Sequence, residues 1–523
     1  MNHIELFAGC GGLSLGLEKA GFDLTLANEL SPMAAETFTY NFLGENLAEL
    51  AKARKAQNKA LWLSSQYQSN DLTQRLRENP FQYPIAGDGI TDIPLNPREL
   101  EGKLVVGNIA DLNKLLEEKP KFRKALMTGF GREGVDLVSG GPPCQSFSMA
   151  GLRNRDCEKN VLPWEFARFV SMVKPKFAIL ENVTGILRAF TEDGISYHAW
   201  FEVAKAFSKI NYIPICLHIN ARLAGVPQNR PRFIMIGVRS NLYKKLYKNL
   251  NANEIKLISP GVEFQKRVAK DMEGIEFGEL PYFDVKKEED LALLEGSFLK
   301  HLVCEQEVSV KEALDDLRFN NPSKKSKFVK NLNKFFENQG TATIINNHEP
   351  RKNGPLVQRR FRLYQILQKC ERSTINEVFE ILKRESSTLS EQAWKNIKEY
   401  KFLIESNELV FFNNKNDLIK FLSAHPTKKR TQKALDQSLP APAALSIPDD
   451  ACHYHDNELR TLTVREMARI QSFPDNFTFR SKVTTGGKMR KFEVPQYTQV
   501  GNAVPPLLGL ALGKAIIELA SRI

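Results

Sequence analysis

Short apolar runs recur along the first 240 residues, and each has the length of a buried β-strand. They read "HIELFAG", "DLTLANE", "KLVVGNI", "VDLVSGG", "FAILENV", "YIPICLHI" and "RFIMIGV". Stretches with helical spacing of their apolar positions, such as "LSLGLEKAG" and "AWFEVAKAFSKI", lie between several of these runs. Buried strands that alternate with amphipathic helices predict an α/β fold with a doubly wound, largely parallel sheet.

This rhythm is interrupted twice. Residues 44–103 contain a polar stretch and then a proline-rich one, which we interpret as an insertion with a helix and a loop. After Val238 the strand and helix rhythm stops, and basic clusters and a Pro/Ala segment follow. We therefore expect a first domain over residues 1–240, with an insertion at about 44–103, and a second domain over residues 241–480.

Regular patterns return near the C-terminus. "TLTVREMARIQSFPDNF" predicts an amphipathic helix that ends at Pro474, and "QVGNAVPPLLGLALGKAIIELA" predicts a Gly/Pro turn followed by an apolar helix. A helix this apolar must be buried. We expect residues 481–523 to return to the α/β core of the first domain.

Composition narrows the class of protein. The chain has 523 residues, of which 42% are hydrophobic and 26% charged, and no run of about 18 apolar residues occurs. The N-terminus lacks the pattern of a signal peptide, so we expect a cytoplasmic protein without a membrane partner. The seven cysteines include no CxxC pair, which argues against a zinc ribbon or a disulfide framework. The formal net charge of +12 favours a polyanionic partner.

Polar and glycine residues stand where the predicted strands end, which is where open α/β sheets bind ligands. The turn "FAGCGG" would let a ligand approach the backbone, although a purely structural turn is equally compatible with it. Glu29 could accept hydrogen bonds from two ribose hydroxyls or be a solvated acid at a strand end. Residues 107–109 would lie beside an adenine.

Cys144 stands in the stretch "GGPPCQSFS". Pro142 and Pro143 fix the backbone and donate no hydrogen bonds, so the preceding strand must end and the thiol is held on a stiff loop. A buried cysteine with no function would normally sit inside a strand or helix instead. Cys144 is therefore a candidate nucleophile.

Three charged residues are candidates to act with this thiol. Glu181 closes the strand "FAILENV" and would place a carboxylate nearby. Arg230 and Arg232, in "QNRPR", could hold an anion or orient a carboxylate. An ion pair at a sheet edge is the plain structural alternative for each of them.

Together these segments resemble the blocks of the cytosine-5 DNA methyltransferases. The resemblance rests on "FAGCGGLSLGLEKAG", "GGPPCQSFS", "KPKFAILENV", "QNRPRFIMIGV", "LTVREMARIQSFPDNF" and "QVGNAVPP", in this order. It implies a Rossmann-like catalytic domain that binds S-adenosylmethionine, and a smaller target-recognition domain, for which residues 241–480 are the candidate.

The resemblance also implies a mechanism. Cys144 would add to C6 of a cytosine flipped out of the duplex, which makes C5 nucleophilic. Glu181 would bind the N3 edge of the base and carry a proton, while Arg232, together with Arg230, would fix the base. S-adenosylmethionine would become S-adenosylhomocysteine, and no metal ion is needed.

The cofactor contacts of the family map onto a defined set of positions in this chain. They are Phe7, Gly9, Gly11, Gly12, Glu29, Asn108, Ile109, Leu162, Asn502 and Ala503. Two positions depart from the family pattern. Asn108 replaces the usual aspartate, and Leu30 replaces a residue that is often aromatic, so we expect weaker or different contacts to adenine.

The resemblance further implies double-stranded DNA as partner, a monomer associated with the bacterial nucleoid, and a separate cognate restriction endonuclease. Two alternatives remain open. One is a tRNA cytosine-5 methyltransferase of the same architecture, which would tend to carry a Cys-Phe-Thr signature and a short recognition domain. The other is a DNA-binding paralogue without activity, which would tolerate loss of Cys144 or Glu181.

Overall fold

A computed structural model describes the chain except for residues 144–160, 193–194, 304–306, 337–344, 428–431 and 444. The chain forms two compact units. The first comprises residues 1–307, 471–473 and 477–523, and the second comprises residues 308–470 and 474–476. These limits differ from the expected boundaries at 240 and 480. Residues 241–307 belong to the first unit because helix α10 (Ala252–Lys270) packs against β9 (Tyr212–Asn220).

The first unit is built on a nine-stranded sheet with the order β11-β9-β10-β6-β5-β1-β2-β4-β3. Its further strands are β1 (Asn2–Leu6), β2 (Asp23–Glu29), β3 (Ala60–Trp62), β4 (Lys103–Val106), β5 (Leu137–Gly140), β6 (Phe177–Val183), β10 (Pro231–Arg239) and β11 (Phe283–Asp284). Each of the seven apolar runs forms one of these strands. β3 and β11 escaped prediction because runs of three and two residues show no periodicity.

The strands β3, β4, β2, β1, β5 and β6 are parallel, so their carboxyl ends meet at one edge of the sheet. β10 runs antiparallel between β6 and β9. Strands β2, β4 and β3 lie on one side of β1, whereas β5, which follows them in sequence, pairs with the other side of β1. This reversal of strand order confirms the doubly wound α/β fold and makes the ends of β1 and β5 the expected ligand-binding position.

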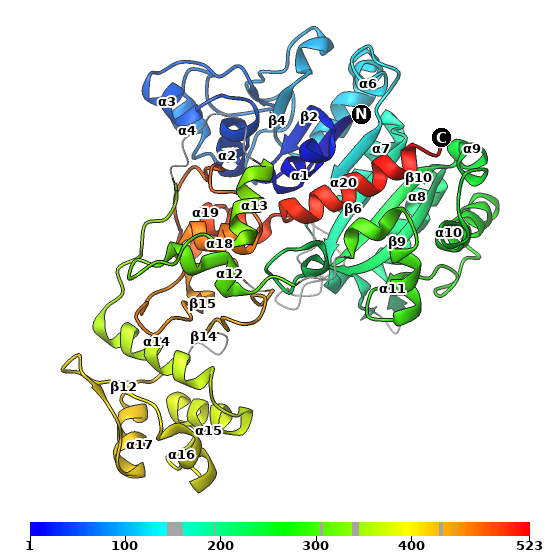
Figure 1. Ribbon diagram of the computed structural model, residues 1–523. Helices are drawn as coiled ribbons and strands as arrows, with labels where there is room; N and C mark the ends of the chain where they lie inside the picture. The colour runs from blue at the N-terminus through cyan, green and yellow to red at the C-terminus, as the bar shows by residue number, and fades with distance from the viewer. Residues whose placement is uncertain (144–160, 193–194, 304–306, 337–344, 428–431, 444) are drawn as a thin grey trace. The chain divides into compact units, whose positions relative to one another are not determined.

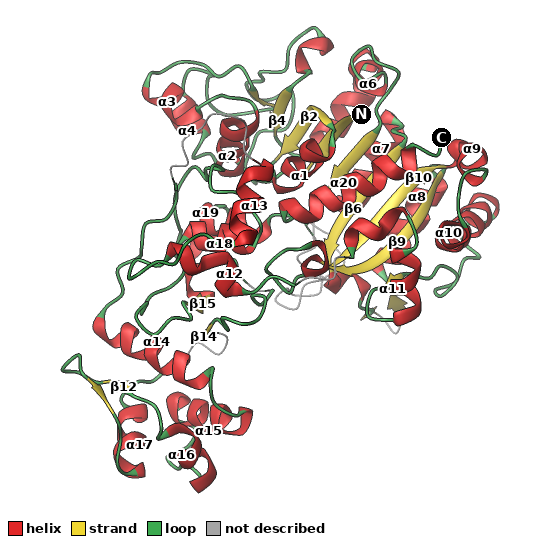
Figure 2. Ribbon diagram, viewed as in Figure 1, coloured by secondary structure: helices red, strands yellow, loops and turns green. Residues whose placement is uncertain are grey.

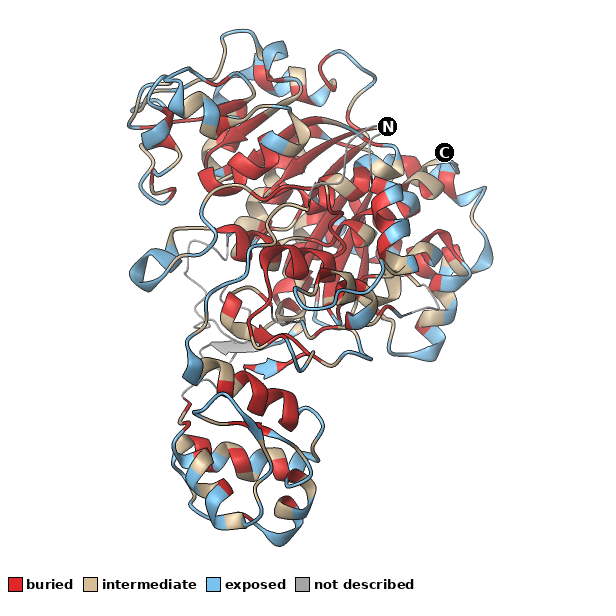
Figure 3. Cartoon of the chain, turned by 60° about the vertical axis from the view of Figure 1, so that its left-hand side comes forward, coloured by how far each residue is buried: buried red, intermediate tan, exposed pale blue. Residues whose placement is uncertain are grey.

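Helices cover both faces of the sheet (Figure 1). The remaining helices of this unit are α1 (Gly12–Ala20), α2 (Pro32–Phe42), α3 (Leu47–Lys52), α4 (Leu72–Arg75), α5 (Ile109–Glu118), α6 (Pro120–Met127), α7 (Leu162–Val173), α8 (Ala199–Lys209), α9 (Tyr243–Tyr247), α11 (Glu288–Glu295), α19 (Gln496–Asn502) and α20 (Pro506–Ala520), and a hairpin pairs β7 (Phe190–Glu192) with β8 (Ile195–Tyr197). One apolar cluster includes residues of α5, α6, α7 and α8, and a second includes residues of α1 and α20. A third cluster lies between α2, α3 and strands β2, β3 and β4. Neighbouring strand residues alternate between the first cluster and one of the other two, and the strands are almost wholly buried (Figure 3).

The C-terminal helix α20 packs against α1 near the start of the chain. A Cβ at Gly16 would clash with the Pro506 carbonyl oxygen and the Leu510 nitrogen, so the two helices touch through their backbones. Such close packing buries the apolar α20. Among the described residues, no single helix is long and apolar enough to cross a membrane, and only the bent pair Gly487–Asn502 with Pro506–Ala520 reaches that length and composition in combination.

The second unit is mostly helical (Figure 2). It contains α12 (Val310–Leu314), α13 (Lys327–Phe336), α14 (Pro355–Leu367), α15 (Arg372–Lys383), α16 (Glu391–Ile397), α17 (Lys415–Ser423) and α18 (Val464–Ile470), with the strand pairs β12 (Phe402–Leu403) with β13 (Leu409–Val410) and β14 (Lys433–Ala434) with β15 (Ala451–Cys452). Helices α14 to α17 surround one apolar cluster.

Helix α18 differs from the amphipathic helix that the sequence predicted, because all seven of its residues are buried. Its charged side chains are paired within the second unit. Arg469 donates to Asp316 at 2.7 Å and to Asp475 at 2.6 Å, and Glu466 accepts from Arg460 at 2.7 Å. Paired charges can be buried where single ones cannot, which is why the polar face of this helix is not exposed.

Candidate active site

Glu29 stands at the carboxyl end of β2 and ties together two strand ends. Its Oε2 accepts a hydrogen bond from the Gly9 backbone N–H at 2.8 Å, and its Oε1 accepts from the Ser31 N–H at 2.8 Å. Burial raises the pKa of this carboxyl, while these N–H donors act in the opposite direction. Each carboxylate oxygen keeps a second lone pair, so Glu29 can still accept bonds from two adjacent hydroxyls.

The turn after β1 has left-handed backbone angles at three positions, with φ of 54° at Phe7, 57° at Gly9 and 94° at Gly11. A Cβ at Gly9 would meet nothing within 4 Å, so this residue borders open space. A Cβ at Gly11 would instead clash with Phe42, and one at Gly12 with the Val504 carbonyl oxygen. Gly11 and Gly12 thus have a packing role, and Gly9 is the glycine of the turn that a ligand can approach.

Asn108 follows β4 and starts helix α5. Its side chain is exposed, and its Oδ1 accepts a hydrogen bond from the Ala110 N–H at 3.0 Å. The asparagine therefore caps the helix, a use for which Asn and Asp are equally suited. The side chain of Ile109, the next residue, is buried in the apolar cluster beneath α5, so a ligand at this strand end would meet the backbone of Ile109.

Glu181 and Arg232 form a buried ion pair at the ends of β6 and β10. Arg232 Nε lies 2.6 Å from Glu181 Oε1, and both residues are 8% exposed. The antiparallel register places Arg232 opposite Val183, so the two charged side chains are diagonal neighbours on one face of the sheet. The carboxylate also lies over Gly141, where a Cβ would be 2.8 Å from Glu181 Oε2.

The carboxylate of Glu181 thus stands at the beginning of the loop that contains Cys144. Cys144 itself lies outside the described residues. Asn182, which the sequence analysis overlooked, holds the start of this loop, because its Nδ2 donates to the Pro142 carbonyl oxygen at 3.0 Å. The "ENV" segment placed this asparagine beside Glu181 in sequence, but only the folded loop reveals its partner.

Arg230 contacts the turn at residues 501–504, which we call the C-terminal turn. Its Nη2 donates to the carbonyl oxygens of Gly501 at 2.7 Å and Ala503 at 3.0 Å, and the residue is 3% exposed. Burial lowers the pKa of this guanidinium below its ordinary value. These contacts fit a residue that positions the C-terminal turn, and a direct catalytic role for Arg230 stays a prediction.

The C-terminal turn contacts the glycine turn at the start of α1. A Cβ at Gly12 would lie 3.3 Å from the Ala503 side chain, so residues 503 and 504 pack on the first turn of α1. Asn502 ends α19 with an exposed side chain. Leu162, the first residue of α7, is half-buried against the cluster that also contacts Phe7. The structure thus brings Gly12 and Ala503 together and leaves Asn502 accessible.

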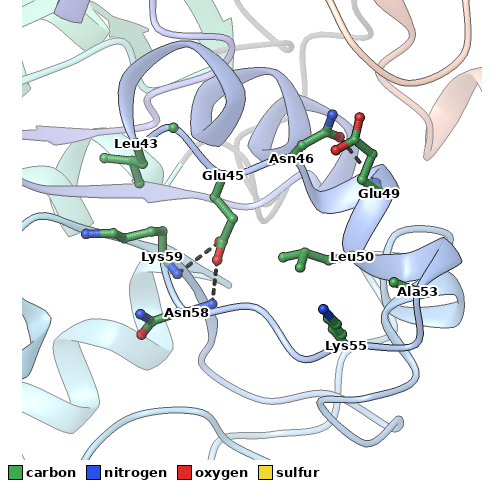
Figure 4. Close-up of a pocket in the computed structure, with 10 residues that line it drawn as sticks. Leu43, Glu45, Asn46, Glu49, Leu50, Ala53, Lys55, Asn58 and Lys59 are labelled. Carbon is green, nitrogen blue, oxygen red and sulfur yellow. Dashed lines mark hydrogen bonds between the residues drawn. The ribbon is translucent and has the colours of Figure 1, made fainter.

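A separate pocket of about 530 Å³ opens near α3 (Figure 4). Its lining includes Glu45, which accepts hydrogen bonds from the backbone N–H groups of Asn58 at 2.6 Å and Lys59 at 2.9 Å. None of the site residues predicted from the sequence lines this pocket. The carboxyl edge of the sheet remains the candidate active site.

The chain is similar to a protein-family model, to curated proteins and to solved structures. A family model described as C-5 cytosine-specific DNA methylase matches residues 1–64 and 111–518. The Type II methyltransferase M.DdeI of Desulfomicrobium norvegicum is 27% identical over 518 residues, covering 99% of this chain and 88% of that protein. The Type II methyltransferase M1.HphI of Haemophilus parahaemolyticus is 24% identical over 522 residues, covering 99% of this chain and 87% of that protein. Among solved structures, the S. pombe Dnmt2 methyltransferase has a TM-score of 0.40 at 13% identity, covering 99% of this chain and 98% of that one.

Proposed function

The chain belongs to the C-5 cytosine-specific DNA methylase family, and on that premise we propose that it transfers the methyl group of S-adenosylmethionine to C5 of one cytosine in a specific double-stranded DNA sequence. The observation that carries the proposal is the buried Glu181–Arg232 pair, 2.6 Å apart, over Gly141. This pair places a carboxylate at the entrance of the loop that contains Cys144, where a cytosine edge can be bound.

The residues at this edge suit a covalent route. C5 of cytosine is a poor nucleophile, so the thiolate of Cys144 adds to C6 and the electron pair moves towards C5. C5 then accepts the methyl group, a base removes the C5 proton, and the thiolate leaves from C6. The cytosine must first leave the duplex, because C6 inside the base stack is out of reach of a protein thiol.

Glu181 and Arg232 divide the task of holding the base. Glu181 binds the N3 and exocyclic amine edge and carries the proton that keeps the covalent adduct neutral. Arg232 fixes the orientation of that carboxyl through Oε1 and adds positive charge next to the ring. Asn182 positions the loop from β6 through the Pro142 carbonyl oxygen.

The residues at the ends of β1, β2 and β4 fit S-adenosylmethionine, which supplies an electrophilic methyl group when bound. Glu29 offers paired acceptors for two ribose hydroxyls, and the open space at Gly9 admits a ligand next to the backbone. Asn108 and the backbone of Ile109 border the position of the adenine. Leu162, Asn502 and Ala503 complete the proposed set.

We assign catalysis to the first unit and recognition of the DNA sequence to the second. The two relatives described above are named Type II methyltransferases, which supports a role in restriction and modification beside a separate endonuclease. We propose that the enzyme acts as a monomer on DNA in the bacterial nucleoid. The basic excess of the chain suits this polyanionic substrate.

Transfer of a labelled methyl group to duplex DNA tests the proposal, and mapping of 5-methylcytosine in that DNA identifies the target. We expect Cys144→Ala to abolish transfer while the melting temperature stays within a few degrees of the wild type.

DNA with 5-fluorocytosine at the target should trap the wild-type enzyme covalently. Wild-type turnover by the Cys144→Ala variant would refute the covalent route, and DNA binding without any transfer by the wild type would identify an inactive paralogue.

A further inference from the structure

Part of the chain that the family model does not match makes specific contacts beside the proposed cofactor site. The match to the family model does not include residues 65–110. In the structure Ser65 and Ile90 form an antiparallel bridge with N–H to carbonyl distances of 3.0 and 2.8 Å. The guanidinium of Arg75 is wholly buried, paired with Asp92 and placed 5.4 Å from the centre of the Trp62 ring. This excursion is therefore a packed element and not a loose loop.

Residues 83–86, which we name the crossing segment, pass over the carboxyl edge of the sheet. Tyr83 packs against the cluster that contains Ala27 and Trp62, whereas Ala86 packs against the cluster that contains Leu63 and Ile109. These clusters lie on opposite faces of the sheet at β3 and β4, so the segment between the two residues must cross its edge.

Hydrogen bonds fix the crossing segment at the carboxyl ends of the strands. The Tyr83 hydroxyl donates to the Leu30 carbonyl oxygen at 3.4 Å, and Leu30 directly follows β2. Ser64 Oγ, two residues after the end of β3, donates to the Ile85 carbonyl oxygen at 3.3 Å. Gly89 lies so close to Pro84 that a Cβ there would clash with the proline ring. The segment is held from both sides.

Tyr83 is thereby placed beside the residues that we assign to the nucleoside. Glu29 directly precedes Leu30, whose carbonyl oxygen accepts the hydrogen bond from the Tyr83 hydroxyl. Leu63 lies against Gly107 at the end of β4, since a Cβ at Gly107 would be 2.7 Å from the Leu63 Cβ. Apolar groups therefore stand near both polar residues, with Leu30 and Tyr83 on the side of Glu29 and Leu63 beside Gly107, the residue before Asn108, which suits a flat, weakly polar ring such as adenine.

We propose that the crossing segment forms the outer wall of the adenosine site, with Tyr83 as a positioning residue that fixes this wall on the Leu30 carbonyl and lays its ring along the nucleoside. The inference rests on the proposed function, because it takes Glu29 to be the acid that binds ribose. The excursion over residues 65–92, which the family model does not match, would then take part in cofactor binding.

Binding of S-adenosylhomocysteine to the full-length protein, measured by calorimetry, tests this inference. We expect Tyr83→Ala to raise the Kd about tenfold, the scale of losing one aromatic contact to a base, and Tyr83→Phe to raise it about threefold. 5′-Methylthioadenosine, which lacks the amino-acid part, should lose affinity by the same factors. The KM for S-adenosylmethionine should rise while kcat and the Kd for DNA change less than about twofold. Leu95→Ala, which removes a fully exposed side chain three residues after the excursion, is the matched control and should change nothing.

Wild-type affinity in Tyr83→Ala, or a loss confined to the ligand with the amino-acid part, would overturn the inference. Glu29→Ala separates this from failure of the proposed function. If Glu29→Ala loses the ligand and Tyr83→Ala does not, only the wall is refuted. If the wild type binds no S-adenosylhomocysteine, the proposed function itself fails. Hydrogen exchange of the wild type needs no variant: the amides of residues 82–90 should exchange more slowly with ligand, and unchanged exchange there would contradict the wall.

Discussion

The role of Glu181 in methyl transfer can be tested with a substitution that leaves the fold intact. Glu181→Gln keeps the size of the side chain but removes the charge and the transferable proton. We expect kcat for methyl transfer to fall about 100-fold or more, the usual scale for losing a general acid or base. The Kd for S-adenosylhomocysteine should stay within about twofold, because Glu29 and not Glu181 is assigned to the nucleoside.

Steady-state kinetics and calorimetry on the same preparations check this expectation. Glu118→Gln is the matched control, since Glu118 is exposed and forms an ion pair with Lys114 at the surface of α5. Its kcat should equal that of the wild type. If Glu181→Gln kept full kcat, Glu181 would be a structural acid at a sheet edge, which is the plain alternative that its sequence context allowed.

Glu5 is a buried acid of β1 that the proposed mechanism does not use. Burial raises its pKa from 4.5 to about 8, and Ser14 donates a hydrogen bond to it. The folded state therefore binds this proton more tightly than the unfolded state does. The contribution of Glu5 to stability is complete below about pH 4.5 and is lost as the pH rises through about 8.

Glu5→Gln removes this titration. We expect the free energy of unfolding of the variant, relative to the wild type, to rise between pH 5 and pH 8, as measured by urea denaturation at several pH values. A difference between Glu5→Gln and wild type that is constant over this range would mean that Glu5 is ionised in the folded protein.

At the scale of elements, the contact of α1 with α20 depends on the absence of a side chain. Alanine normally stabilises a helix interior relative to glycine by about 0.5–1 kcal/mol. At Gly16 the added Cβ would clash with the backbone of α20, so the sign should reverse. We expect Gly16→Ala to destabilise the first unit by about 1–3 kcal/mol, the usual cost of overpacking.

Thermal unfolding monitored by calorimetry measures this cost as a fall in melting temperature. Gly486→Ala is the control, because a Cβ there meets nothing within 4 Å and the backbone angles are ordinary. Its melting temperature should stay close to that of the wild type. A rise in the melting temperature of Gly16→Ala would show that the two helices can move apart without loss.

The sequence predicted elements well wherever periodicity extends over several residues, as in the seven strands of the sheet. It failed where burial depends on partners distant in sequence. Helix α18 carries Arg465, Glu466 and Arg469, which indicate an exposed face until Asp316 and Asp475 are seen beside Arg469. Glu29 and Glu181 could be selected because each stands at the end of a predicted strand. The hydrogen bonds of Asn182 to Pro142 and of Tyr83 to Leu30 form only in the folded chain, so no sequence pattern indicates them.

For the whole molecule, the net charge of +12 bears on its partner and not on its fold. If the polyanion is duplex DNA, each phosphate that a lysine or arginine neutralises releases a counterion, and log K falls with log salt by about 0.9 per contact. With about six contacts, the affinity for a 30-base-pair duplex should fall about 1000-fold between 50 and 200 mM salt. Binding of S-adenosylhomocysteine, which rests on hydrogen bonds and apolar contact, should change less than about twofold over the same range. Fluorescence anisotropy of the duplex and calorimetry of the small ligand measure the two dependences side by side. A flat dependence for DNA would show that the basic excess does not contact phosphates, and an equally steep one for the small ligand would show that salt perturbs the protein itself.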